Sequence, residues 1–151
     1  MVNVIVELSK YILLLLMIWF TMESFLVLSK KKESTRKNIF RKQIIILLSF
    51  DLLAFFVMFL QTEDVKMILM YGSVLLYILF TQMLYRMIYK KASMNLVNNM
   101  CMLLSVGFII LSRLKIDNAF KQIQIVALST AVSFLIPVII RKAKFVRDLT
   151  W

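Results

Sequence analysis

The 151-residue sequence contains no histidine, one cysteine, one proline and two glycines. Without histidine, the chain lacks the commonest zinc ligand and the commonest acid–base group that titrates near neutral pH. Its single cysteine, Cys101, cannot form an internal disulfide, and its position in an apolar run favours a packing role. With only Gly72 and Gly107, no glycine-rich phosphate loop can be drawn. We therefore expect no metal, no cofactor and no catalytic residue.

Apolar residues, in contrast, make up 62% of the chain, and the mean hydropathy is +0.86. They fall into five runs, at 11–28, 43–60, 67–84, 97–111 and 123–140. Each run approaches the ~20 residues that a helix needs to cross ~30 Å of hydrocarbon. The runs are continuous rather than alternating, which argues against a membrane barrel. The sequence predicts an all-α, polytopic membrane bundle of about five transmembrane helices.

Positive charge is distributed unevenly among the segments that separate these runs. The chain has 19 basic and 8 acidic residues, for a net charge of +11. Fourteen basic residues fall in alternate segments, at 30–42, 86–91 and 141–147, and five fall in the others. Because basic loops tend to stay in the cytoplasm, we predict an external N-terminus and a cytoplasmic C-terminus. Membrane orientation accounts for this charge, so we expect the lipid bilayer rather than nucleic acid as the partner.

The last two runs lead to different expectations. The fourth has only 100–111 as an uninterrupted apolar stretch, which is short for a span. In the fifth, small residues recur four positions apart, Ala127 with Ala131 and Ser129 with Ser133, which lets two helix backbones approach closely. This pattern predicts that the fifth helix is buried.

Two carboxylates lie inside predicted spans, Glu23 and Asp51, at similar depths in the cytoplasmic half. A charge at the centre of a membrane helix costs ~2.5 kcal/mol or more, so such groups usually face a partner or a cavity. Gln82 and Arg86 lie at comparable depth on the third span, and we predict a polar cluster of these four residues. The cluster could be a polar pocket or proton path, or it could simply lock three helices together.

A second candidate site lies between the fourth and fifth runs. Arg113, Lys115 and Lys121 lie on the predicted external side, against the usual charge bias. They could contact a phosphate-bearing lipid or an acidic partner, or they could reach back to the membrane interface.

From Asn98 onward the chain has a recognisable order of motifs. They are GFIILSRL at 107–114, Ala119, KQ at 121–122, RK at 141–142 and RDLTW at 147–151. This order resembles the beginning of the FtsW/RodA/SpoVE (SEDS) family of bacterial cell-wall proteins, in which a helix leads to a short external loop with a basic–Gln pair and a second helix returns to a basic turn. The resemblance adds Gln122 to the external candidate site. A Tyr-Ser-Ala-Ser-like segment common in the family is absent, and Leu-Ser-Arg stands at 111–113 instead.

The resemblance implies two parts, a three-helix N-terminal extension at 1–95 and the first two core helices of a SEDS-like domain at 96–151. SEDS proteins polymerise the glycan of lipid II beside a class B penicillin-binding protein in the bacterial plasma membrane. Their catalytic aspartate is expected in a later external loop that this sequence does not contain. We therefore expect the N-terminal part of such a protein, inactive alone. The alternatives are a free-standing membrane module that binds a partner, or a small carrier that uses Glu23 and Asp51.

Overall fold

The computed structural model describes residues 1–89 and 93–149, with the backbone alone at 146. In the segments discussed above, Lys90 and Lys91 of 86–91 and Thr150 and Trp151 of the RDLTW motif lie outside the described residues. The described chain forms five helices: α1 (Val2–Ser29), α2 (Glu33–Thr62), α3 (Val65–Ile88), α4 (Met94–Leu114) and α5 (Ile116–Leu149). All five are long and apolar enough to cross a membrane, which confirms the predicted number of spans.

Every helix is longer than the apolar run that predicted it, because residues on both sides of the run, many of them polar, continue the helix. The extension matters most for the fourth run, whose uninterrupted apolar stretch is by itself short for a span. It becomes α4, a helix of 21 residues. At 1.5 Å per residue this is ~31 Å, enough to cross the hydrocarbon.

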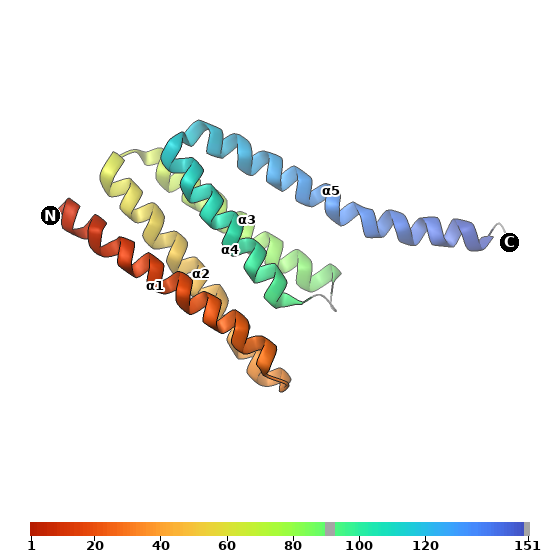
Figure 1. Ribbon diagram of the computed structural model, residues 1–151. Coiled ribbons are helices and arrows are strands. Elements are labelled where there is room, and N and C mark those ends of the chain that lie inside the picture. The colour runs from red at the N-terminus through yellow and green to blue at the C-terminus, as the bar shows by residue number, and fades with distance from the viewer. Residues whose placement is uncertain (90–92, 150–151) are drawn as a thin grey trace.

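Short connections force successive helices to run antiparallel. Glu63 ends α2 in the left-handed region with φ 50°, and Asp64 caps α3 by accepting a hydrogen bond from the Lys66 backbone N–H at 3.0 Å. The second and third helices therefore form a tight hairpin. Lys115 alone, in extended conformation, separates α4 from α5. The two turns lie at the same end of the bundle, where Lys66 Nζ and Asp117 Oδ1 are 3.6 Å apart. We call this the Met1 end, and the opposite end, where α1 meets α2, α3 ends and α4 begins, the basic-loop end (Figure 1).

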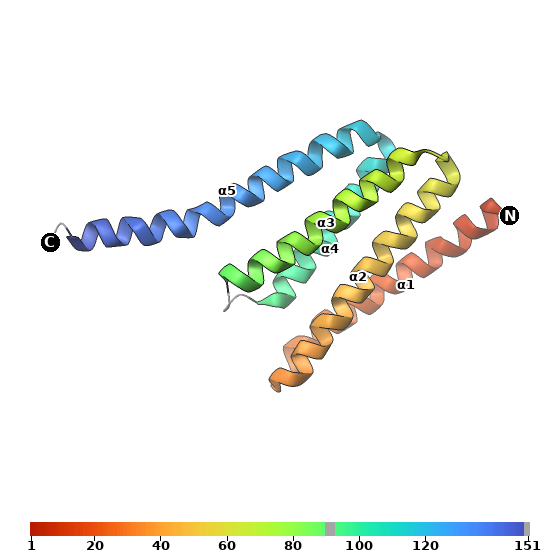
Figure 2. The same ribbon diagram turned by 180° about the vertical axis from the view of Figure 1, so that it is seen from behind.

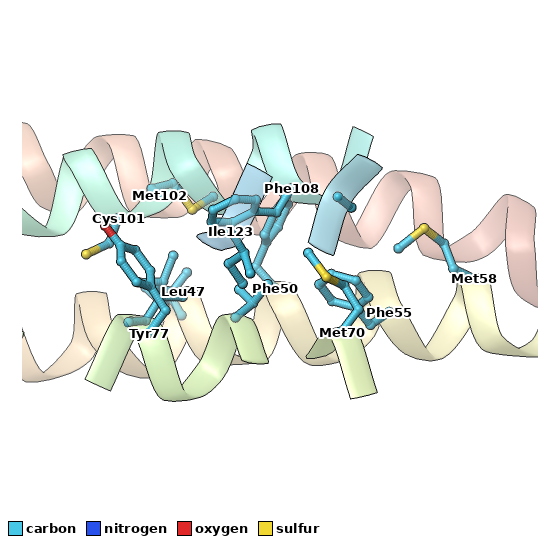
Figure 3. Packing of buried hydrophobic residues seen from close by; sticks show 14 of the residues in the cluster. Leu47, Phe50, Phe55, Met58, Met70, Tyr77, Cys101, Met102, Phe108 and Ile123 are labelled. Carbon is cyan, nitrogen blue, oxygen red and sulfur yellow. The ribbon is translucent and has the colours of Figure 1, made fainter. Parts of the chain in front are cut away.

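The core lies among α2, α3 and α4, with α1 packed mainly on α2 (Figures 1 and 2). Buried positions on these three helices recur alternately three and four residues apart, as in coiled-coil packing. On α4 they are Asn98, Cys101, Ser105, Phe108 and Ser112. Figure 3 shows the apolar part of this core, which Ile123 reaches from α5. Cys101 is fully buried, in agreement with a packing role.

The prediction that the fifth helix is buried is wrong. In α5 only 6% of the most apolar window is buried, and Ala127, Ser129, Ala131 and Ser133 are all exposed. The helix packs on α3 and α4 near its start and then diverges from the other four (Figures 1 and 2). Its contacts are made by larger side chains instead, because small residues bring helices together only where a second helix runs alongside.

Farther along α5, one aromatic residue maintains contact with α3. The ring of Phe134 lies 5.0 Å from that of Tyr85 and 5.8 Å from that of Tyr89, between centroids. One turn earlier, Tyr77 Oη and Thr130 Oγ1 form a hydrogen bond of 2.9 Å between the same two helices. α5 therefore contacts α3 as far along its length as Phe134.

Candidate functional site

The most extensive polar feature is a hydrogen-bonded cluster that joins four helices inside the bundle. We call it the amide network. Its members are Ser24 of α1, Gln43 of α2, Gln82 of α3, and Asn95, Asn98 and Asn99 of α4. All of them are buried except Asn99, which is half-buried. Their common location is the half of the bundle towards the basic-loop end.

Gln43 is the centre of the network and is fully buried. Its Nε2 donates to Ser24 Oγ at 3.2 Å and to Asn95 Oδ1 at 3.1 Å. Its Oε1 accepts from Asn98 Nδ2 at 2.8 Å. Both donor hydrogens and the acceptor of this amide are therefore used, as expected for a polar group removed from water.

The remaining bonds extend the network to the outer helices. Gln82 Nε2 of α3 donates to Asn98 Oδ1 at 2.6 Å. On the other side, Ser24 lies 3.0 Å from Asn99 Oδ1, and Asn95 Nδ2 donates to the Ser24 carbonyl at 3.3 Å. Amides and hydroxyls are neutral near pH 7, and the hydrogen bonds of the Ser24 hydroxyl within the described residues go to a backbone carbonyl and to amides, none of which is a base that could activate it. The chemistry of the network is that of a lock between helices.

Asp51 forms a separate contact deeper in the bundle. It is 1% exposed, and its Oδ2 accepts a hydrogen bond of 3.0 Å from Ser105 of α4. Its second oxygen, Oδ1, has no hydrogen-bond partner in the described part of the chain. Asp51 therefore ties α2 to α4 through one bond only.

Glu23 lies apart from Asp51, on α1. It is 7% exposed, and Trp19 of the same helix donates to its Oε1 through Nε1 at 3.3 Å. The Trp19 ring is itself 50% exposed on the outer face of α1. Glu23 is thus attached to its own helix rather than to a neighbouring one.

The four-residue cluster predicted from the sequence does not assemble among the described residues. Gln82 joins the amide network, while Asp51 and Glu23 each have another partner. Arg86 is exposed near the end of α3, and neither ion pair found in residues 1–89 and 93–149 involves it. Gln82 bonds Asn98, whereas Asp51 bonds Ser105, seven residues or ~10 Å farther along α4, so these two groups lie at different depths. Glu23 lines a hollow formed by α1 alone.

The residues of the second candidate site do lie close in the chain, at the α4–α5 turn. Arg113, Lys115, Lys121 and Gln122 are all exposed. Gln122 also lines an apolar hollow of about 390 Å³ between α4 and α5, whose other walls include Gly107 and Val126. The turn therefore combines exposed positive charge with an adjoining apolar surface.

Sequence reasoning missed most of the amide network. In the sequence, Asn98 and Asn99 precede the uninterrupted apolar part of the fourth run and Gln43 begins the second, and these positions alone do not predict contacts between helices. A signal was present, however: Asn98, Ser105 and Ser112 are seven residues apart and so share one helix face. A polar residue repeating on the buried face of an apolar helix indicates contacts between helices.

Within the described residues, no group of three His, Cys, Asp or Glu side chains is placed to hold a metal ion. Comparison of the chain with protein-family models, with curated proteins and with solved structures finds no match to any of them.

Proposed function

We propose that this chain is the N-terminal region of a SEDS-like protein of the bacterial plasma membrane, which handles lipid-linked precursors in peptidoglycan synthesis during division, elongation or sporulation. The observation that carries the proposal is the α4–α5 hairpin. The motifs that resemble the family fall on this hairpin, with the GFIILSRL segment ending α4 and the KQ pair in the second turn of α5. A one-residue connection and a basic tip agree with the short external loop that the resemblance implies.

The orientation is part of the proposal. Of the 19 basic residues, 14 belong to segments that would be cytoplasmic if the basic-loop end faces the cytoplasm. The Met1 end, with the α4–α5 turn, would then face outward, where a class B penicillin-binding protein has its enzymatic domain and lipid II its sugar headgroup.

Labelling of introduced cysteines tests this orientation. In a Cys101→Ala background, a cysteine at Lys115 should react with a membrane-impermeant maleimide in intact cells. A cysteine at Lys31, which is equally outside the apolar runs, should react only after the membrane is opened. The opposite pattern would place the basic-loop end outside and contradict the proposed orientation.

The basic turn gives a test of the ligand. A surface Lys or Arg contributes ~1 kcal/mol to binding at an anionic surface. The double variant Arg113→Gln, Lys115→Gln is therefore expected to bind nanodisc-borne lipid II ~10- to 30-fold more weakly than wild type. Lys10→Gln, which removes one exposed charge from α1, serves as the control and should change binding by no more than ~5-fold.

The comparison must include nanodiscs with phosphatidylglycerol in place of lipid II. A preference for lipid II that the double variant loses supports the proposal. Equal binding of wild type to both lipids, or no loss in the double variant, would contradict it.

The exposed part of α5 favours a second candidate, a module that binds another membrane protein. Between Ile123 and Phe134, no residue of α5 is fully buried. Copurification separates the two functions. Purification together with a class B penicillin-binding protein, combined with lipid II binding, favours the first. A stable complex with a different membrane protein, without binding of lipid II, favours the second.

A further inference from the structure

The outward face of α1 has a feature that neither proposed function uses. A row of side chains surrounds a shallow hollow of about 340 Å³, and all of them come from this one helix. They are Leu15, Ile18, Trp19, Met22, Glu23 and Leu26. We call this row the α1 stripe.

The spacing of the stripe is that of a helix-docking surface. Leu15, Trp19, Met22 and Leu26 are separated alternately by four and three residues, and each is 45–60% exposed. This is the period at which one helix packs along another. An apolar stripe by itself could equally face lipid, because lipid tails are as apolar as leucine.

Glu23 distinguishes the stripe from a surface that meets lipid alone. It is the one acidic residue lining the hollow, and its hydrogen-bond partner is Trp19, at 3.3 Å on the same helix. No ion pair found among the described residues involves it. A carboxylate inside a membrane span usually faces a partner or a water-filled cavity. Without either, its burial in the membrane costs ~2.5 kcal/mol or more.

The depth of Glu23 limits what that partner can be. The residue lies six positions before Ser29, the last residue of α1, or ~9 Å inside the end of the helix. A lipid headgroup amine would have to leave the interface to reach it. A Lys or Arg side chain from an adjacent membrane helix can reach this depth and supply the opposite charge.

We propose that the α1 stripe docks a transmembrane helix of another protein, and that this helix presents a Lys or Arg side chain to Glu23. The apolar members of the stripe supply the packing surface, and the carboxylate sets the register and selects the partner. The proposal concerns α1 and does not depend on a SEDS function for the α4–α5 hairpin.

Photocrosslinking in native membranes tests this, with the full chain carrying a photoreactive amino acid at one position. Leu26 lies in the stripe, one turn from Glu23. Phe25, its neighbour, is 69% exposed but lies outside the stripe, so it is a matched control that is even more accessible than Leu26 at 45%. We expect one discrete protein adduct from position 26, at least ~5-fold stronger than from position 25. Mass spectrometry should place the crosslink in an apolar span that contains Lys or Arg.

Substitution of Glu23 then tests the chemistry. Glu23→Gln keeps the size of the side chain and should lower the adduct yield ~5-fold or more, and Glu23→Lys should abolish it. Replacing the partner's basic residue by Glu should restore the adduct with Glu23→Lys. An unchanged thermal unfolding midpoint for Glu23→Gln shows that α1 remains folded on α2.

Three results would overturn the proposal. They are lipid adducts alone at both positions, an adduct between two copies of this chain, and a protein adduct whose yield is the same with Glu23→Gln.

Discussion

Replacing Gln43 by leucine is expected to lower the free energy of unfolding by about 2 kcal/mol. The substitution removes three hydrogen bonds at once, to Ser24, Asn95 and Asn98. Hydrogen bonds between membrane helices average ~0.6 kcal/mol each, and the polar groups left without a partner in a buried site add to the loss. Leucine is similar in size to glutamine, so the loss reports the polar contacts rather than a cavity.

Unfolding of the purified chain in mixed micelles, followed by circular dichroism, measures this effect. Thr21→Val is a suitable control because Thr21 is exposed and bonds only the Met17 carbonyl of its own helix. It should change the free energy by less than ~0.5 kcal/mol. A Gln43→Leu variant as stable as the Thr21→Val control would show that the amide network contributes little to the fold.

Replacing Phe134 by alanine is expected to release the later part of α5 from α3. Phe134 is the buried residue that contacts both Tyr85 and Tyr89. Removing a buried phenylalanine from a soluble core costs ~3–5 kcal/mol. In lipid the transfer part of this cost is smaller, so we expect about 2 kcal/mol and a shift towards conformations with α5 detached.

Distances between spin labels at Met87 and Ile139, both exposed, measure this release in nanodiscs. The Phe134→Ala variant should give a longer and broader distribution than wild type. Leu135→Ala is the control, because Leu135 is adjacent and 56% exposed, and it should leave the distribution unchanged. Identical distributions for the two variants would show that Phe134 does not hold α5.

The polar residues that join the helices in the amide network are uncharged. Sequence reasoning assigned significance to charge, and so to Glu23, Asp51 and Arg86. The structure instead joins neutral amides and one hydroxyl from four helices, and Glu23 and Asp51 bond other partners. Neutral amides suit this role because each both donates and accepts, so a network of them can be satisfied without any charge leaving water.

The number of helices could be predicted from the sequence, because a helix in hydrocarbon must satisfy its own backbone and only length and apolarity decide whether it can span. Their full lengths could not, because each helix continues beyond its apolar run. The tight turn at Glu63 and Asp64 was also predictable, since it follows from a short polar link between two apolar runs. Both features depend on residues that are close together in the chain.

What only the tertiary structure decided is which faces meet. The burial of Gln43 against Asn98 depends on the rotation of each helix about its own axis. The separation of Glu23 from Asp51 depends also on their levels along the bundle, and the exposure of the small residues of α5 depends on the divergence of that helix from the others (Figure 1). In a membrane span nearly every side chain is apolar, so the contrast between polar and apolar faces that orients a helix in a soluble protein is weak. The sequence by itself therefore determined that there are five helices long and apolar enough to span a membrane, and packing between them determined which residues each one buries.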